Sequence, residues 1–266
     1  MADDREALRA RFDEDALLYD TARPTYPAAL FAAIDERLPE HVPVAPQVLE
    51  IGCGTGQATL PLARRGYDIV AVDLGADMAR VARRKLQNFH NVEVVNADIE
   101  QWDPPAERFD LVVCATAFHW LDPATRYNRV ARFLRPGGLL ALIQTIHIAG
   151  PSDSFFHGAQ RCYEHWDPAT PPGQRLRKLT DLPATSDYGI EQADDFEDVR
   201  IQRFTANHRY TAEQYLDLLN TFSNHRALPP PNRKGLFACI RERINAEPNR
   251  TITKSVAFEL STALRR

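Results

Sequence analysis

A glycine-rich turn follows a short apolar segment near the start of the chain and has the composition of a nucleotide-binding loop. Gly52, Gly54 and Gly56 lie in it, and a chain that turns sharply and approaches a ligand with its backbone leaves no room there for a Cβ atom. The helix expected to follow offers free N–H donors at its N-terminus. Asp73 ends the next apolar segment, where a carboxylate accepts hydrogen bonds from ribose hydroxyls. These residues predict a site for a ribose-containing ligand.

The spacing of the glycines argues against a dinucleotide. Dinucleotide-binding proteins carry the pattern G-x-G-x-x-G. Here Gln57 occupies the position of the third glycine, and Gly56 comes one residue too early. Glu50 precedes the loop, and its negative charge would repel a pyrophosphate. The plain alternative is that the glycines only turn the chain, but the strand before them and the helix after them favour a ligand-binding loop.

The segments that must position this loop alternate between apolar runs and helical patterns. The runs are rich in leucine and β-branched residues with little polar alternation, as in strands buried on both faces. Such alternation predicts a parallel, doubly wound α/β sheet. The predicted strands span 47–53, 68–74, 92–98, 109–117 and 138–146, and the predicted helices span 56–65, 77–88 and 124–134.

Further elements flank this core on both sides. Residues 4–37 predict two helices separated by a proline-containing turn at 23–27. After the core, Thr211 and Gln214 form a capping-box pattern that opens a helix. The other predicted elements are a helix from Ser152 to about Trp166, a strand over 198–210, a helix from 229 to about 248 and a strand over 251–264.

These elements divide the chain into four expected parts. They are an N-terminal helical cover over 1–45, a ligand-binding core over 46–148, an insertion over 149–197 that covers the substrate, and strands and helices over 198–266 that complete a seven-stranded, mostly parallel sheet.

The stretch 48–142 resembles class I methyltransferases, which use S-adenosylmethionine, in the order and spacing of several motifs. The motifs are VLEIGCGTG, NADIEQW, RFDLVVCATAFHW and LRPGGLLAL. The resemblance implies a Rossmann-like fold in which Glu50 holds the methionine portion of the cofactor and Asp98 accepts from the adenine amino group. It further implies cofactor contacts by Ile99, Met78 and Ala115.

The segment YDTARPTYP at 19–27 is similar to the lead-in helix of small-molecule methyltransferases of the trans-aconitate and menaquinone-biosynthesis type. In that group the segment folds over the cofactor. The resemblance implies that Tyr19 and Arg23 meet the methionine carboxylate, Arg23 through a charge-assisted fork. The alternative is that Arg23 is a surface residue next to a turn.

Candidate catalytic and pocket residues follow the fourth predicted strand. His119 lies at the carboxyl edge where open α/β sheets bind ligands, and its imidazole is a candidate general base. A role in ordering the loop or contacting the cofactor edge is the alternative. Aromatic residues that could line a substrate pocket, with core packing as the alternative for each, are Tyr26, Phe118, Trp120, Phe156 and Trp166.

Composition limits the partners. The chain has 266 residues, of which 44% are hydrophobic and 26% charged, as in a globular protein that buries a core. A net charge of −4 and a pI near 6.1 argue against a general nucleic-acid binder. No apolar stretch is long enough for a membrane span, and no signal peptide is recognised. The four cysteines are scattered, which predicts neither a disulfide nor a zinc site, so we expect a cytoplasmic location and no metal.

The sequence therefore predicts transfer of a methyl group from S-adenosylmethionine to oxygen, nitrogen or carbon of a small molecule. Two alternatives stay open. One is the same fold acting on RNA or protein, although the motif that amino-directed nucleic-acid enzymes place after the fourth strand is replaced here by ATAFHW. The other is a non-catalytic module that only binds S-adenosylmethionine. The sequence gives no indication of the oligomeric state.

Overall fold

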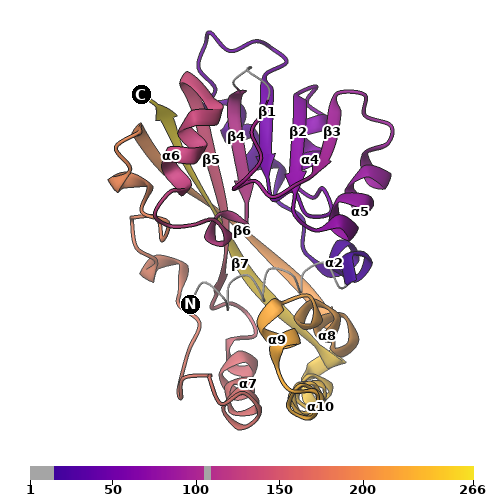
Figure 1. The fold of residues 1–266 in the computed structure, drawn as a ribbon. Coiled ribbons are helices and arrows are strands. Elements are labelled where there is room, and N and C mark those ends of the chain that lie inside the picture. Colours follow the sequence, from indigo (N-terminus) through magenta and orange to yellow (C-terminus); the bar gives the residue numbers. More distant parts are fainter. Residues whose placement is uncertain (1–14, 105–108) are drawn as a thin grey trace. The chain divides into compact units, whose positions relative to one another are not determined.

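A seven-stranded sheet dominates the fold in the computed structural model, which describes residues 15–104 and 109–266 (Figure 1). Its strand order is β3-β2-β1-β4-β5-β7-β6. Strands β1 to β5 pair in parallel, and β7 runs antiparallel to them, so the sheet is mixed. The expected seven-stranded α/β sheet is confirmed. The strands are β1 (Gln47–Ile51), β2 (Asp68–Asp73), β3 (Val92–Asn96), β4 (Phe109–Ala115), β5 (Leu134–Ile148), β6 (Phe196–Thr211) and β7 (Thr251–Arg265).

Helices α8 and α10 begin where the sequence predicts. Thr211 and Gln214 form the expected capping box at the start of α8, and two prolines occupy the first turn of α10, where the missing N–H has no intrahelical partner to lose. In the described residues the α-helices are α2 (Ala16–Ala22), α3 (Ala28–Asp35), α4 (Thr59–Ala63), α5 (Ala76–Leu86), α6 (Arg126–Phe133), α7 (Asp153–Trp166), α8 (Ala212–Asn220), α9 (Ser223–Ala227) and α10 (Pro230–Ala246). Helix α9 was not expected, and the part of the first expected helix before residue 15 lies outside the described residues.

Strand β5 begins earlier than expected because its first residues pair irregularly. It starts at Leu134, whereas the sequence predicts a strand from 138. The pairing with β4 shifts its register between Phe109 and Leu111, which accommodates the turn-forming residues Pro136 and Gly137. Pro136 and Gly137, which locally predict a turn, therefore lie within the first part of β5.

The described chain separates into two compact units. One, here called the helical unit, consists of 15–24, 146–182 and 205–257 and contains α7, α8, α9 and α10. The other, here called the sheet unit, consists of 25–104, 109–145, 183–204 and 258–266 and contains β1 to β4. The four parts expected from the sequence are consecutive stretches of chain, whereas each compact unit combines segments that are far apart in the sequence. The division into four parts stays a prediction.

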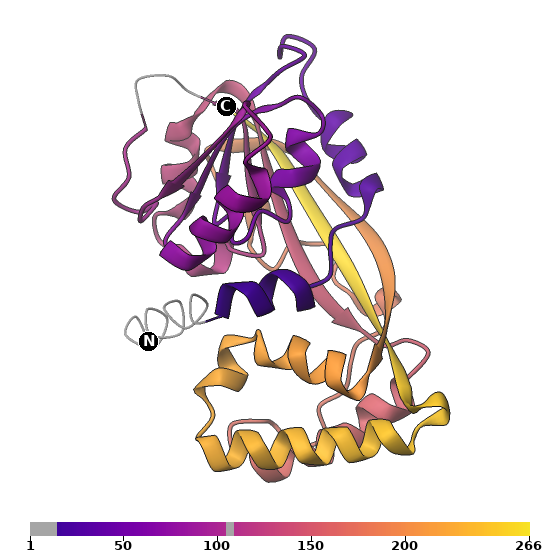
Figure 2. The ribbon, with the colours of Figure 1, turned by 90° about the vertical axis from the view of Figure 1, so that its right-hand side faces the viewer.

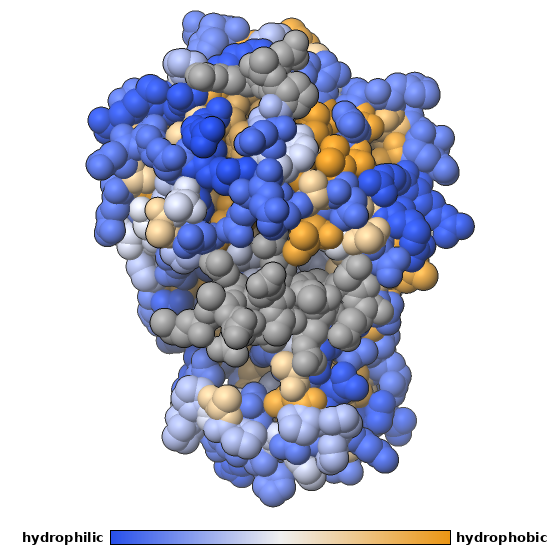
Figure 3. Space-filling view, in the orientation of Figure 1, coloured by the Kyte–Doolittle hydropathy of each residue, from blue (hydrophilic) through white to orange (hydrophobic). Residues whose placement is uncertain are grey.

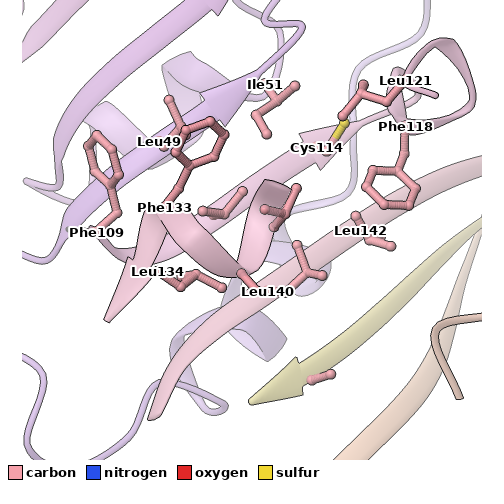
Figure 4. Close-up of a cluster of buried hydrophobic side chains, with 14 of the residues drawn as sticks. Leu49, Ile51, Phe109, Cys114, Phe118, Leu121, Phe133, Leu134, Leu140 and Leu142 are labelled. Atoms are coloured by element: carbon pink, nitrogen blue, oxygen red, sulfur yellow. The ribbon is translucent and has the colours of Figure 1, made fainter. Parts of the chain in front are cut away.

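The core of the sheet unit lies between α6 and one face of the sheet (Figure 4). Leu49 and Ile51 of β1 belong to the same buried cluster as Phe133 of α6. Successive side chains of a strand point to opposite faces. Glu50, between these two residues, therefore points to the other face, where α4 and α5 contact β2.

The core of the helical unit is formed by α7, α8 and α10, which pack together (Figure 2). Phe155 of α7 and Tyr215 of α8 meet edge to face, with their ring centroids 6.4 Å apart. Helix α10 approaches α7 closely at Gly235, where a Cβ atom would lie 2.5 Å from the Trp166 ring. Glycine at this position lets the indole pack directly on the helix backbone.

A disulfide joins these helices, and the sequence-based prediction that the cysteines form none is wrong. Cys162 of α7 bonds to Cys239 of α10 across 77 residues of sequence. Cys53 and Cys114 are free and buried, as expected for cysteines that act as small hydrophobes. Disulfides are uncommon in the cytosol, and the cytoplasmic location stays a prediction.

Hydrophilic residues cover most of the described surface in Figure 3, and hydrophobic residues form separate small groups on that face. The strongly exposed large hydrophobic residues, Leu17, Val44, Leu74 and Leu179, are spread along the sequence. Among the residues that the structure describes, no helix has the length and hydrophobicity needed to cross a bilayer.

The disulfide is expected to stabilise the helical unit. Replacing both Cys162 and Cys239 by alanine should lower the free energy of unfolding by about 2–4 kcal/mol, because the crosslink restricts the unfolded chain. Urea denaturation of both proteins with and without dithiothreitol measures this. The reductant should lower the stability of the wild type and leave the double variant unchanged; equal responses would show that the bond contributes nothing.

Candidate active site

The candidate residues of the sheet unit come together because parallel strands end at the same edge of a sheet. Glu50 lies near the end of β1, Asp73 ends β2 and Ala115 ends β4. Asp98 follows β3 by two residues. The adjacent order β3-β2-β1-β4 places these four positions along one continuous edge, which is where open α/β sheets bind ligands.

The glycine loop has a backbone that other residues would strain. Gly52, Gly54 and Gly56 have φ angles of 69°, 55° and 82°, a region that L-residues with a Cβ atom rarely adopt. A Cβ atom on Gly52 would lie 2.5 Å from Cβ of Ala117, in the loop after β4. The loops after β1 and β4 thus approach so closely that only glycine fits.

Asp73 fixes the turn that follows β1. One oxygen, Oδ2, accepts a hydrogen bond of 2.7 Å from the N–H of Gly54, and Oδ1 accepts one of 2.8 Å from the N–H of Gly75. The side chain of Asn96 donates to the carbonyl oxygens of Asp73 and Leu74 at 3.0 and 2.8 Å. Each carboxylate oxygen can accept more than one hydrogen bond.

Glu50 is a buried acid without a full set of partners. Its residue is 1% exposed, and its Oε2 atom has no hydrogen-bond partner. Burial, with a smaller contribution from the charge of Asp73, raises the pKa of Glu50 to about 8, and the Thr59 hydroxyl opposes this rise. A cation or hydrogen-bond donor placed at Oε2 would satisfy this group.

Several polar residues near the loop were not expected from the sequence. The hydroxyl of Thr55 and the amide nitrogen of Gln57 are buried without a hydrogen-bond partner. Such groups are costly unless a ligand or water satisfies them. The sequence GTGQAT places polar residues in the loop and the first helical turn, and the glycine pattern alone does not predict their role.

Thr116 is a further residue that sequence reasoning missed. It follows β4 directly and has a φ of 57°, an uncommon conformation for a β-branched residue. Its hydroxyl lies 3.1 Å from the Tyr26 hydroxyl and 3.4 Å from that of Thr145. Tyr26, predicted as a pocket residue, is thereby held against the loop after β4.

The residues predicted for the adenine are partly buried at the end of β3 and on α5. Asp98 Oδ1 accepts from the N–H of Glu100 at 3.1 Å, so its carboxylate is fixed by the turn that follows. Ile99 is 4% exposed and packs in the core of the sheet unit. Met78 of α5 is 3% exposed. Their contacts with a cofactor stay predictions.

His119, Phe118 and Trp120 form the short 3-10 helix η2 (Phe118–Trp120). Phe118 is fully buried against Tyr127 and Tyr188, so packing alone accounts for its position. The His119 ring stacks at an angle on Trp120, with centroids 4.6 Å apart. Although the residue is exposed overall, partial desolvation of its ring and the charge of Arg126 lower the pKa of His119 to about 4.

The other predicted residues lie in the helical unit. The Arg23 guanidinium donates to the hydroxyl and carbonyl oxygens of Thr221 at 2.8 and 3.1 Å and lies 4.9 Å from the ring centre of Tyr19. Phe156 and Trp166 pack against the core of that unit. Roles of these four residues toward cofactor or substrate stay predictions.

Comparison with known proteins places this geometry in a family. Residues 48–138 match the family described as methyltransferase domain. The chain carries a class I methyltransferase domain. Its cofactor is S-adenosylmethionine.

The similarity to individual proteins extends beyond this domain. An uncharacterized methyltransferase of Schizosaccharomyces pombe is 28% identical over 253 residues, which cover 94% of each chain. Trans-aconitate 2-methyltransferase of Afipia carboxidovorans is 37% identical over 111 residues, 41% of this chain and 42% of that protein. The solved structure of a putative type II methyltransferase from Anaeromyxobacter dehalogenans superposes with a TM-score of 0.62 at 23% identity, covering 92% of this chain and 97% of the other. This last likeness shows the fold.

The residues of the methyltransferase domain fit the cofactor. The glycine loop leaves space that a Cβ atom would fill, and Glu50 presents an unpaired buried oxygen suited to the ammonium group of the methionine portion. Asp73 and Asp98 offer carboxylates at the same edge of the sheet, suited to a ribose and an adenine amino group.

Replacing Gly52 by alanine should disrupt cofactor binding. The new methyl group meets Ala117 in addition to requiring a positive φ, so we expect the affinity for S-adenosylhomocysteine to fall by at least about tenfold. Gly66→Ala is the matched control, because Gly66 has a φ of 80° but no atom within 4 Å of its added Cβ. Calorimetry of the two variants should show loss only for Gly52→Ala; equal losses would remove the steric argument.

Glu50 should make stability depend on pH. Its pKa is raised from 4.5 to about 8 in the folded state, so between these values the folded protein binds the proton more tightly than the unfolded chain. The free energy of unfolding therefore falls as the pH rises through this window. Urea denaturation at several pH values should give a flatter dependence for Glu50→Gln than for the wild type, while Glu93→Gln, at an exposed position, keeps the wild-type slope. Parallel curves for all three proteins would contradict the assignment.

Proposed function

We propose that the chain transfers the methyl group of S-adenosylmethionine to an oxygen, nitrogen or carbon atom of a small molecule. The observation that carries the proposal is the loop after β1, where Asp73 binds the N–H of Gly54 at 2.7 Å and where Oε2 of the nearby Glu50 has no hydrogen-bond partner. This arrangement supports a bound nucleoside that also carries a positively charged amino acid portion.

A small acceptor is supported by charge and by the relatives. The net charge of −4 is unfavourable for a polyanionic nucleic acid. The relative from Afipia carboxidovorans is a trans-aconitate 2-methyltransferase, and trans-aconitate is a small molecule. Both observations favour a metabolite over RNA as the acceptor.

The cofactor supplies an activated methyl group when bound, so the protein's contribution is to bind, orient and desolvate. In our proposal Glu50 holds the amino group of the methionine portion, and Asp73 accepts from the ribose hydroxyls. Asp98, held by the N–H of Glu100, accepts from the adenine amino group. Met78, buried on α5, provides apolar contact for the adenine ring. Orientation of this kind is worth roughly 7–11 kcal/mol of activation free energy.

His119 is the candidate to accept a proton when the acceptor must lose one. Its lowered pKa keeps the imidazole neutral at physiological pH, so a ring nitrogen is free of its proton and can accept one. A base with a pKa near 4 is weak at pH 7. We therefore propose that His119 mainly positions the acceptor, by accepting a hydrogen bond from its hydroxyl or amino group.

A methyl-transfer assay with radiolabelled S-adenosylmethionine tests the proposal. A pool of small metabolites should accept label, and total RNA and protein should not. Asp73→Ala should reduce affinity for S-adenosylhomocysteine by about 10- to 100-fold, because a hydrogen bond to a charged group is worth about 1.5–3 kcal/mol.

Asp77→Ala is the matched control for that variant. Asp77 lies on α5 in an exposed ion pair with Arg80, which contributes little, so binding and transfer should match the wild type. Label in RNA or protein but not in metabolites would refute the small acceptor, and cofactor binding without any transfer would indicate a non-catalytic module.

A further inference from the structure

The helical unit contains a cluster of basic side chains, of which Arg23 alone is among the residues predicted to contact the cofactor. We define the basic cluster as Arg23 at the end of α2, His147 in β5, His225 in α9 and Lys254 in β7. Three of these surround one aromatic ring, that of Phe222. The Arg23 guanidinium lies 4.0 Å from its centre, and the rings of His147 and His225 lie at 5.8 and 5.7 Å.

Lys254 is the most unusual member of the cluster. It has the same strand parity as Ile252, which belongs to the core of the helical unit, and it is 6% exposed. Its Nζ atom lies 4.9 Å from the ring centre of Phe156 and 5.8 Å from that of Tyr215. Within 15–104 and 109–266 it makes no ion pair and no hydrogen bond. A buried ammonium without an acceptor is costly.

The other members also lack acidic partners. Arg23 bonds only neutral oxygens of Thr221 among the described residues, which occupies two of its five N–H donors. Nδ1 of His147 is buried without a hydrogen-bond partner. Both cations and this nitrogen therefore retain hydrogen-bonding capacity.

The carboxylate that acts on this cluster, Asp167, is already engaged. Its charge raises the pKa of His225, but burial outweighs this effect and lowers that pKa to about 4. Its Oδ1 and Oδ2 atoms accept from the N–H of Ala169 at 3.1 Å and the hydroxyl of Thr170 at 3.0 Å. The cluster thus carries net positive charge from Arg23 and Lys254, with two imidazoles that stay neutral at pH 7.

We propose that the basic cluster binds a small molecule that carries a carboxylate, with Lys254 as its principal ion-pair partner. Two positive charges and a neutral imidazole can bind one or two carboxylate groups by charge-assisted hydrogen bonds. The rings of Phe156, Tyr215 and Phe222 offer apolar contact to a short hydrocarbon stem. That this molecule is the methyl acceptor rests on the proposed function.

Calorimetry on the full chain, saturated with S-adenosylhomocysteine, tests this inference. The probes are malonate, succinate and tricarballylate, with succinamide as the uncharged match of succinate and inorganic phosphate as the competing anion. At least one carboxylate should bind, succinamide and phosphate should bind at least tenfold more weakly, and Lys254→Met should reduce carboxylate affinity by at least tenfold.

Lys234→Met is the matched control, because Lys234 is exposed on α10 of the same unit, and it should bind like the wild type. Lys254→Arg should retain binding that Lys254→Met loses. The affinity for S-adenosylhomocysteine and the melting temperature show that each variant folds.

Absence of carboxylate binding, equal binding of succinamide, preference for phosphate or unchanged binding by Lys254→Met would each overturn the inference. These failures are separable from failure of the proposed function. Methyl transfer to a metabolite without carboxylate binding would refute only the inference. Carboxylate binding that depends on Lys254, without transfer to any small molecule, would support the site and refute the proposed function.

Discussion

The geometry of the candidate active site depends on one carboxylate that holds two turns. Asp73 binds the N–H of Gly54 in the loop after β1 and the N–H of Gly75 just before α5. Ordering a loop that contains three glycines with positive φ costs conformational entropy. The hydrogen bonds that the Asp73 carboxylate accepts offset part of this cost. Burial raises the pKa of Glu50, and the charge of the same carboxylate adds to this rise.

The sequence predicts the parts of the fold that depend on neighbouring residues. The seven strands, the capping box at Thr211 and the glycine loop all arise from patterns within a few residues, and all are found. The long-range features could not be predicted in this way. Cys162 and Cys239 meet only because α7 and α10 pack together, and the shifted start of β5 depends on its pairing with Phe109.

In the candidate site, too, local sequence predicts some residues, whereas the positions of others depend on long-range packing. Glu50, Asp73 and Asp98 could be identified because each lies at or just beyond the carboxyl end of a strand whose position is predictable, and these ends form the ligand edge. The positions of the aromatic side chains could not be predicted in this way. Phe118 follows β4 in the sequence, but its side chain is fully buried in the core. Packing against Tyr127 and Tyr188 determines where the ring points, and the position of the residue after the strand does not.

Glu50 and Lys254 are buried ionisable groups of opposite charge, and desolvation shifts the pKa of both. Burial raises the pKa of the acid and lowers that of the base, each to about 8, because desolvation disfavours the charged form of either. Neither group stabilises the unliganded protein, since an apolar residue of similar volume would avoid the desolvation cost. A partner of opposite charge reverses this balance by restoring the charged form. Local sequence identifies Glu50 because a motif surrounds it, whereas Lys254 lies in an alternating strand where lysine ordinarily indicates a solvent-facing position. The parity that it shares with Ile252 and the packing of Phe156 and Tyr215 around its ammonium show that this lysine faces inward.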